Sequence, residues 1–550
     1  MTTGRTGGRI IVDQMLIHGA DTAFCVPGES YLPVMDALYD VSDRIRLIAT
    51  RHEAAAVNMA EAYGKLTGRP GLALVTRGPG ALQGSVGLHT AAQDSTPMIL
   101  FIGQVASSRR GREGFQEVDY ELTFRDIAKW SVEIRDPKRI PEIIARAYNT
   151  AVSGRPGPVV IALPEDVLSA SVDVQDAGAY TVVQAHPGFD DIQKVYHVIR
   201  QAQRPMVVVG GSAWRPAAVR ALRTFVEEHN LPVVTSFRRQ DLIDNESNSY
   251  AGTLGPGVNP ALAQRIREAD VILAVGARLG ELTTSNYTLL QSPVPVQTLV
   301  HVHPGAEELG RVFQAKVAIN SGPTEFVSAL GKISGLASDH FADWCNGAHA
   351  DYMDFSTTRE EAPPSGYVDL GRVVAHLSTK LPADSIITNG AGNYTIWAHR
   401  YYRFTQPGTQ IAPTSGAMGY GFPAGLAAKI VHPDREVIVF AGDGCFLMTG
   451  TELATAVQYG LNVVVLVVNN GAYGTIRMHQ ERRFPGRVIG TELRNPDFTD
   501  FARAFGAYGE RVTVTEEFPA ALERARRAGR PALLELVTDP KVLTPTFRLE

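Results

Sequence analysis

Two uninterrupted apolar runs set the strongest constraint on how this chain can fold. The runs are "VIVFA" at residues 437–441 and "LNVVVLVV" at residues 461–468, and neither shows a regular alternation of apolar and polar residues. Such runs are typical of strands that are covered on both faces of a sheet. The segment 452–459 between them suits a helix, so we expect a strand–helix–strand unit with parallel neighbouring strands. The chain is therefore predicted to be an α/β protein.

Polar residues follow both apolar runs. Asp443 stands between Gly442 and Gly444 after the first run, and Asn470 follows the second run. Because the carboxyl ends of parallel strands share one edge of a sheet, we expect these two side chains to lie together. A carboxylate and an amide oxygen suit Mg²⁺, and the glycines leave room for a bulky anion such as a diphosphate. The alternative is that Asp443 caps the next helix and Asn470 lies in a turn.

The length of 550 residues exceeds what one hydrophobic core supports. Three blocks of alternating strands and helices are predicted, at residues 1–168, 189–336 and 367–550, each a doubly wound parallel sheet. The middle block is expected to be Rossmann-like. The polar segments 169–188 and 337–366 are predicted to be linkers.

Composition excludes several classes of function. The net charge is −5 and no long basic run occurs, so neither nucleic acid nor an anionic membrane surface is an expected partner. No segment reaches the roughly 18 to 20 apolar residues of a membrane span. Three scattered cysteines are too few for a disulfide framework or a zinc site. The start, "MTTGRTGGR", has no signal-peptide core and is predicted to be frayed, so a cytoplasmic location is expected.

Further segments resemble thiamine-diphosphate enzymes, and within that superfamily the acetolactate synthase group. In chain order they are "FCVPGESYLPVMDAL", "RHEAAAVNMAEAYGKLTG", "RGPGALQGSVGLHTAAQDSTPMILFIGQV", "FQEVD", "GRPGPVVIALPEDV", "APTSGAMGYGFPAGLAAKI" and the "GDG…NN" pair. Each segment alone is a weak signal, but their joint order spans nearly the whole chain. The resemblance implies a pyrimidine-binding domain at 1–168, a central domain at 189–336 and a diphosphate-binding domain at 367–550.

The resemblance assigns the third block to the diphosphate of the cofactor and to Mg²⁺. Asp443, Asn470 and the Ala472 carbonyl would hold the metal. The other residues expected at the cofactor are Asn393, Tyr394, Gly442, Gly444, Cys445, Tyr473 and Gly474. Among them, Gly444 and Cys445 would give backbone N–H groups to the phosphates.

Two regions would activate the cofactor, according to the same resemblance. Met418 would support its bent shape, with the Gly416 C=O and the Met418 N–H paired to the aminopyrimidine ring. Glu53 matches the glutamate that bonds this ring. Ordinary core packing of Met418 and a simple helix-terminus role for Glu53 are the alternatives. Because the family places this glutamate against a cofactor held by another subunit, we expect at least a homodimer, and commonly a homotetramer.

Three residues are expected to act on the substrates. Gln116 matches an active-site glutamine of acetolactate synthases, which favours carboligation. Glu29 stands where the related decarboxylases carry an acid, so it is a candidate proton donor. His89 is a second candidate, because imidazole as a group can take up and release protons, although it could instead bond a backbone carbonyl.

The sequence departs from its relatives at other positions. Ile476 stands where pyruvate decarboxylases carry a glutamate, and the chain has no His–His pair. His479 stands where acetolactate synthases carry a tryptophan, so the acceptor pocket is expected to differ. The segment that binds FAD through an acidic residue in biosynthetic relatives carries His301 and His303 here. Neutral histidine cannot replace both bonds of a carboxylate, so FAD binding stays open without support from the sequence.

The resulting hypothesis is an acetolactate synthase-like carboligase that depends on thiamine diphosphate and Mg²⁺. It would decarboxylate a small 2-oxo acid and transfer the resulting acyl carbanion to an acceptor carbonyl. The alternative on the same scaffold is a non-oxidative 2-oxo-acid decarboxylase or a 2-hydroxyacyl lyase. A nucleotide-binding dehydrogenase would need a G-x-G-x-x-G turn that opens a helix, which this chain lacks.

Overall fold

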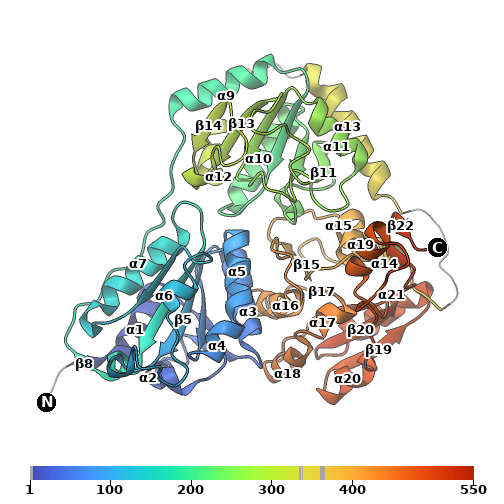
Figure 1. Cartoon of the computed structure of the whole chain (residues 1–550). Helices are drawn as coiled ribbons and strands as arrows, with labels where there is room; N and C mark the ends of the chain where they lie inside the picture. The colour runs from blue at the N-terminus through green and yellow to red at the C-terminus, as the bar shows by residue number, and fades with distance from the viewer. Residues whose placement is uncertain (1–3, 333–335, 337–338, 359–365) are drawn as a thin grey trace. The chain divides into compact units, whose positions relative to one another are not determined.

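The computed structural model describes residues 4–332, 336, 339–358 and 366–550. The chain forms two compact units. The first comprises Met1–Val183, Pro413–Asp434 and Phe446–Val463, and the second comprises Gln184–Ala412, Arg435–Cys445 and Val464–Glu550. Three six-stranded sheets carry the fold, one in the first unit and two in the second (Figure 1). All neighbouring strands in these sheets are parallel, which confirms the predicted α/β class with three parallel sheets.

The sheet of the first unit has the strand order β3-β2-β4-β5-β7-β6. Its strands are β2 (Thr22–Cys25), β3 (Arg46–Ala49), β4 (Gly71–Val75), β5 (Met98–Gln104), β6 (Trp130–Glu133) and β7 (Pro158–Pro164). The helices of this unit are α1 (Gly7–Ile17), α2 (Leu32–Tyr39), α3 (Glu53–Thr67), α4 (Pro79–Gln83), α5 (Ser85–Asp94), α6 (Tyr120–Thr123), α7 (Ile140–Val152), α8 (Glu165–Ser169), α16 (Gly421–Val431) and α18 (Leu453–Gln458). A short antiparallel ribbon of β1 (Arg5–Thr6) and β8 (Ser171–Val172) accompanies them.

The central sheet, in the second unit, has the order β11-β10-β9-β12-β13-β14. Its strands are β9 (Pro205–Val209), β10 (Val233–Thr235), β11 (Tyr250–Thr253), β12 (Val271–Val275), β13 (Thr298–His303) and β14 (Val317–Asn320). Around it lie α9 (Phe189–Gln201), α10 (Pro216–Glu228), α11 (Pro260–Glu268), α12 (Pro323–Leu330) and α13 (Ala342–Ser356), as Figure 1 shows. This strand order is that of dinucleotide-binding Rossmann domains.

The third sheet has the order β16-β15-β17-β18-β20-β19. Its strands are β15 (Ile386–Asn389), β16 (Gln410–Ile411), β17 (Val437–Gly442), β18 (Val464–Asn469), β19 (Tyr508–Val512) and β20 (Ala532–Val537). The remaining elements of this region are α14 (Leu370–Lys380), α15 (Tyr394–Tyr401), α17 (Asp443–Phe446), α19 (Gly474–Arg483), α20 (Phe498–Ala504), α21 (Phe518–Arg526), β21 (Val542–Thr544) and β22 (Phe547–Arg548). The two apolar runs form β17 and β18, which pair in parallel as predicted.

The first and third sheets share one topology. In each, the second strand along the chain lies outside the first, and the third and fourth strands continue in the opposite direction. The direction therefore reverses between β2 and β4 in one sheet and between β15 and β17 in the other. Loops that leave the carboxyl ends of such strands diverge, and ligands of open α/β sheets bind there.

Two predicted irregular segments contain regular structure. Thr6 caps α1 by accepting a hydrogen bond from the Arg9 N–H, and Gly7 and Gly8 are buried, so the predicted fraying is wrong from residue 5 onward. The predicted linker 337–366 contains α13, whose Trp344 side chain donates to the Pro205 carbonyl (2.9 Å). Residues 1–3, 337–338 and 359–365 of these segments lie outside the described residues.

Helix α3 packs closely against its sheet. It is rich in alanine and almost entirely buried, and Gly68 ends it in a left-handed conformation with φ of 69°. A Cβ atom on Gly71, the first residue of β4, would lie 1.8 Å from the Ala60 carbonyl oxygen of α3. Only glycine at this position permits the observed approach of helix and strand.

No helix in the described part of the chain combines the length and the apolar character that crossing a membrane requires.

We predict that Gly71→Ala destabilises the first unit by about 2–3 kcal/mol, because the new methyl group must displace α3. The measurement is the midpoint of thermal unfolding. Gly178→Ala is the matched control, since nothing lies within 4 Å of a Cβ atom built there. Equal midpoints for the two variants would show that α3 does not depend on this contact.

Candidate active site

Asp443 lies at the carboxyl end of β17 and is buried, with an exposed fraction of 2%. One carboxylate oxygen accepts from the Gly444 N–H (2.9 Å), and the other accepts from the Asn495 Nδ2 (2.8 Å). Burial raises the pKa of Asp443, and N–H groups of Gly444, Asn495, Gly471 and Ala472 partly oppose this rise. The carboxylate is thus held in a place that favours a cation beside it.

Asn470 follows β18, the neighbour of β17, so the two predicted metal ligands leave adjacent strands. The Asn470 Oδ1 accepts from the Ala472 N–H (3.2 Å), and the Asn469 Oδ1 accepts from the Gly471 N–H (3.1 Å). These hydrogen bonds form a turn. The alternative predicted from the sequence, in which Asn470 lies in a turn, is therefore observed as well. Asn495 links Asn469 to Asp443, because its Nδ2 also donates to the Asn469 Oδ1 (2.9 Å).

The oxygen donors at this edge fit a magnesium ion. They comprise one carboxylate, one amide oxygen and the Ala472 carbonyl, which are hard ligands of the kind Mg²⁺ prefers. Among the described residues, no cluster of three or more His, Cys, Asp or Glu side chains could hold a metal ion.

Tyr394 and Cys445 come together beside the same edge. The Tyr394 hydroxyl donates to the Cys445 Sγ (3.3 Å), and burial raises the pKa of Tyr394 well above its ordinary value. A Cβ atom on Gly442 would lie 3.0 Å from the Tyr394 ring, and one on Gly444 would lie 2.5 Å from the Tyr473 ring. The two glycines thus admit two aromatic rings next to the buried carboxylate.

Asn393 precedes α15 and is tied to α19. Its N–H donates to the Thr475 Oγ1 (2.9 Å), and this hydroxyl donates to the Asn393 Oδ1 (2.9 Å). Gly474 begins α19, and the Tyr473 N–H donates to the Thr491 carbonyl (2.8 Å). The predicted cofactor residues of the second unit therefore lie on three loops at one sheet edge, after β15, β17 and β18.

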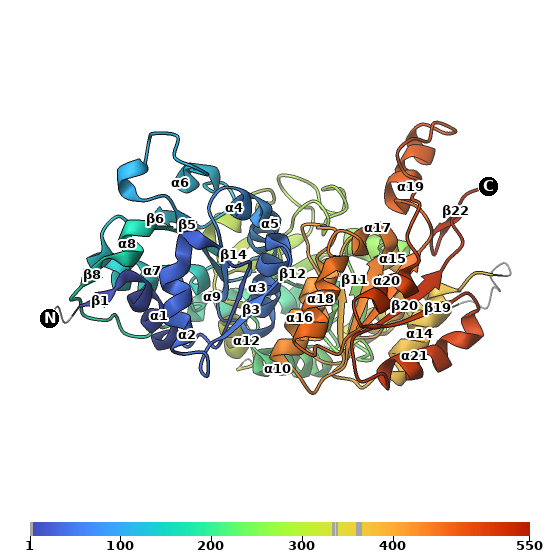
Figure 2. The ribbon, with the colours of Figure 1, turned by 90° about the horizontal axis from the view of Figure 1, so that it is seen from below.

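Ile476 and His479 lie on α19 with exposed side chains. Figure 2 shows α19 and the turn after it extending away from β19 and β20 of the same unit. The nearby Arg477 forms an ion pair with Glu481 (2.8 Å), one turn further along the helix.

Glu53 is the first residue of α3 in the first unit, and its exposed fraction is 9%. His52 caps the helix, because its Nδ1 accepts from the Ala54 N–H (3.0 Å). A Cβ atom on Gly80 would lie 3.1 Å from the Glu53 Oε1, so glycine there leaves space for the carboxylate.

The turn before Glu53 is held by residues that the sequence analysis did not single out. Glu452 is fully buried, and its two oxygens accept from the Arg51 N–H (3.0 and 3.2 Å). Burial raises the pKa of Glu452, and a bond from the Thr455 hydroxyl (2.5 Å) opposes the rise. The Ala49 N–H also donates to the Tyr459 hydroxyl (2.8 Å). In the sequence, the one indication of this role is an acid at the start of the predicted helical segment 452–459.

Arg77 is a second residue that the sequence analysis missed. Its exposed fraction is 4%, its Nη2 lies 3.5 Å from the Glu29 Oε1, and its Nη1 pairs with Glu165. Its Nε donates to the Phe115 carbonyl (3.1 Å), which directly precedes Gln116. Arg77 therefore connects Glu29, which is exposed, to the loop of Gln116.

His89 lies on α5 with an exposed side chain. In the part of the chain that the structure describes, no hydrogen bond or ion pair joins the His89 imidazole to Glu29 or Gln116. Within the described residues, none joins this imidazole to a backbone carbonyl either. Neither of the two predicted roles of His89 gains support from its contacts.

Gly416 and Met418 lie in a loop of the first unit. Gly416 has φ of 71° and is exposed, whereas Met418 is half-buried. The loop is anchored by the Thr414 N–H, which donates to Asp94 (2.7 Å), and by the Gly419 carbonyl, which accepts from Thr449 (2.8 Å). The two backbone groups predicted to pair with the cofactor make no hydrogen bond within the described residues.

The two histidines of β13 both contact the backbone of the central domain. The His301 Nε2 contacts the Ala277 carbonyl (3.0 Å), and burial lowers its pKa. The His303 Nδ1 accepts from the Gly305 N–H (3.0 Å). Their contacts therefore fit structural roles within the central sheet.

The chain is similar to known proteins over nearly its whole length. Three family models of thiamine pyrophosphate enzymes match the chain: the N-terminal TPP binding domain at residues 5–122, the central domain at 192–330 and the C-terminal TPP binding domain at 390–536.

Similar proteins include the acetolactate synthase large subunit of Corynebacterium glutamicum, which is 31% identical over 97% of this chain and 86% of the relative. The large subunit of acetolactate synthase isozyme 2 from Escherichia coli is 31% identical over 97% and 95%. That of Parasynechococcus marenigrum is 32% identical over 96% and 87%. The chain therefore belongs to the thiamine pyrophosphate enzymes, and within them to the family of acetolactate synthase large subunits.

Proposed function

We propose that this enzyme, with thiamine diphosphate and Mg²⁺, decarboxylates a small 2-oxo acid such as pyruvate and joins the remaining acyl unit to the carbonyl carbon of an acceptor. The observation that carries this proposal is that the first and third sheets share one strand order and each carries polar residues where that order reverses. Asp443 is buried at the edge of the third sheet. In the first unit, Glu53 begins α3 and Gln116 lies on the loop before α6. Similarity to acetolactate synthases over nearly the whole chain supports the same reaction.

In the second unit, Asp443, Asn470 and the Ala472 carbonyl hold Mg²⁺ in this proposal. The buried Asp443 supports it, because a cation offsets the cost of burying the charge. The residues that would hold the diphosphate are Asn393, Tyr394, Gly442, Gly444, Cys445, Tyr473 and Gly474. When bound, thiamine diphosphate supplies a carbon nucleophile and accepts the electron pair that decarboxylation leaves.

In the first unit, the Glu53 carboxyl would share a proton with the aminopyrimidine ring. Its position inside a tight turn, with Glu452 bonded to the preceding backbone, supports a fixed orientation. Gly416 C=O and Met418 N–H would pair with the same ring, and the Met418 side chain would pack against the cofactor. Gln116 donates from its amide to the acceptor, while Glu29 and His89 are proposed to move protons at the substrate.

We propose an assembly of at least two copies, commonly four, in which Glu53 acts on a cofactor held by a partner subunit. Exposed apolar side chains of the first unit support burial against another chain. They include Leu82, Val86, Phe115, Leu447 and Met448. We also propose a cytoplasmic location for the protein. The three cysteines are buried free thiols, which agrees with a reducing compartment.

The direct test is to identify the products formed from pyruvate with added thiamine diphosphate and Mg²⁺, alone and with a second 2-oxo acid or an aldehyde. We expect acetolactate or acetoin, whose new C–C bond reports transfer to an acceptor. Acetaldehyde as the only product would contradict the proposal and favour the decarboxylase.

Glu53→Gln is expected to lower turnover by at least about 100-fold, because an amide cannot give up the proton that the carboxyl shares with the cofactor ring. The amide keeps the size of the side chain, so the affinity for thiamine diphosphate, measured by calorimetry, should change little. Turnover close to that of the wild type would remove Glu53 from the mechanism.

A further inference from the structure

Gln116 has a backbone conformation that residues with a side chain rarely adopt. Its φ is 63°, and a Cβ atom on the facing Gly78 would lie 2.8 Å from the Gln116 Cβ. A non-glycine residue in this region persists only where its surroundings fix it. The half-buried Gln116 side chain makes no hydrogen bond within the described residues. Its own contacts therefore do not explain the conformation.

The residues on both sides of Gln116 are fixed instead. The Phe115 carbonyl accepts from the buried Arg77 (3.1 Å). On the other side, the Glu117 Oε1 accepts from the Arg110 Nη1 and from the Gly111 N–H (2.8 Å each), and its Oε2 accepts from the Gly114 N–H (2.9 Å). These N–H groups, followed by Arg110, lower the pKa of Glu117. The Glu117 carboxylate thereby closes the loop 110–117.

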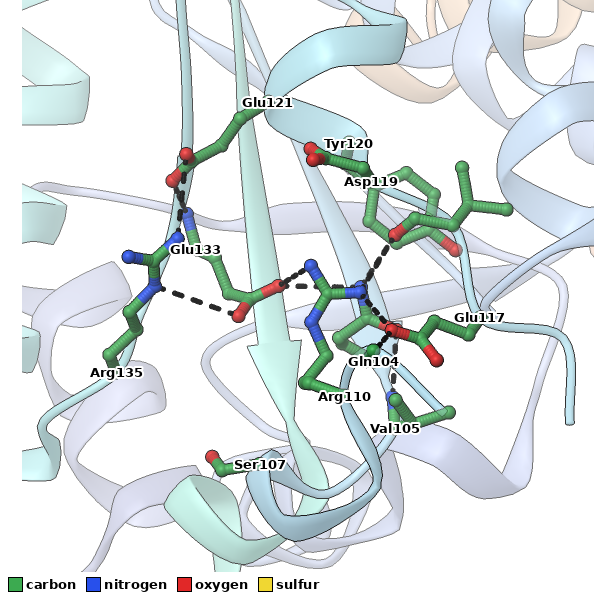
Figure 3. Close-up of polar contacts among 12 residues, drawn as sticks. Gln104, Val105, Ser107, Arg110, Glu117, Asp119, Tyr120, Glu121, Glu133 and Arg135 are labelled. Carbon is green, nitrogen blue, oxygen red and sulfur yellow. Dashed lines mark hydrogen bonds and ion pairs between the residues drawn. The ribbon is translucent and has the colours of Figure 1, made fainter. Parts of the chain in front are cut away.

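Arg110 connects this closed loop to the sheet. Figure 3 shows its guanidinium between Glu117 and Glu133, and its Nη2 lies 3.1 Å from the Glu133 Oε2. Glu133 ends β6 and Gln104 ends β5. The fully buried Gln104 donates to the Val118 carbonyl (2.8 Å) and to Glu133 (3.4 Å). The loop is thus tied to the ends of two strands, on rigid parts of the fold.

We propose that the Arg110–Glu117 pair is a positioning device that presents the Gln116 amide to the acceptor and so sets how often a C–C bond forms. Neither residue of the pair touches the substrate; both act through Gln116. With the amide in place, the acyl carbon bonds to the acceptor carbonyl carbon, whose oxygen takes up a proton. Without it, a proton reaches the acyl carbon first and an aldehyde leaves. This inference rests on the proposed function.

The test compares products from pyruvate in the holoenzyme with thiamine diphosphate and Mg²⁺. In Glu117→Gln, the ratio of acetolactate to acetaldehyde should fall about tenfold, the size expected when one charge-assisted contact is lost. Total CO₂ release should change much less, because decarboxylation does not need the acceptor. Glu142→Gln is the matched control, since Glu142 pairs with Arg139 (2.6 Å) on the surface of α7 and contacts none of these residues.

A double-mutant cycle distinguishes a positioning role of the Arg110–Glu117 pair from a general effect on stability. Gln116→Ala should shift the product ratio as Glu117→Gln does, and the combined variant should be no worse than Gln116→Ala alone. If Glu117→Gln folds poorly, Arg110→Lys takes its place in the test. Lysine keeps the charge but cannot bridge both acids as guanidinium does, so the product ratio should shift in the same way.

The outcomes are distinguishable. A wild-type enzyme that forms no C–C product contradicts the proposed function and this inference together. If the wild type forms acetolactate, the inference alone fails when the product ratio is unchanged in Glu117→Gln, or in Arg110→Lys where Glu117→Gln does not fold. Additive effects in the double variant also contradict it.

Discussion

The structure depends on one constraint: parallel strands deliver the loops that follow them to a single edge of the sheet. Where the strand order reverses, the loops on either side diverge, and backbone N–H groups and side chains there can face a ligand. The first and third sheets of this chain share the same order and therefore the same point of reversal. One edge carries Asp443, and the other carries the loops of Glu29 and Arg77. The two halves of the proposed site are thus built by the same topology, used twice.

Acids held by hydrogen bonds from the backbone are the second recurring element, and two of the three, Asp443 and Glu452, are buried. Asp443 accepts from Gly444, Glu452 accepts from Arg51, and Glu117 accepts from Gly111 and Gly114. Burying a carboxylate is costly unless N–H donors or a cation surround it. At Asp443, amide and carbonyl oxygens of Asn470 and Ala472 follow the neighbouring strand, and these oxygens are the reason for proposing Asp443 as a metal ligand. At Glu452 and Glu117 the bonds fix a turn next to a proposed functional residue.

The sequence predicts what depends on local patterns. Unbroken apolar runs predicted β17 and β18 and their parallel pairing, and the alternation of strands with helices predicted three sheets. The contacts that complete the site depend on distant parts of the chain. Nothing near Asn495 indicates that it reaches Asp443, and nothing near Arg77 indicates that it joins Glu29 to the loop of Gln116. In the same way, residues 342–356 of the predicted linker have little amphipathic pattern, and their packing beside β11 and α11 explains why they form α13.

The central claim is that each active site combines Asp443 of one subunit with Glu53 of another. Mixing chains that carry Glu53→Gln with chains that carry Asp443→Asn tests it directly, after unfolding and reassembly or by joint expression. Each variant alone should be inactive, whereas the mixture should recover about a quarter of the wild-type turnover, because half of the twofold dimers are mixed and each has one intact site. A mixture as inactive as its two components would contradict the claim and place both residues in the same subunit's site.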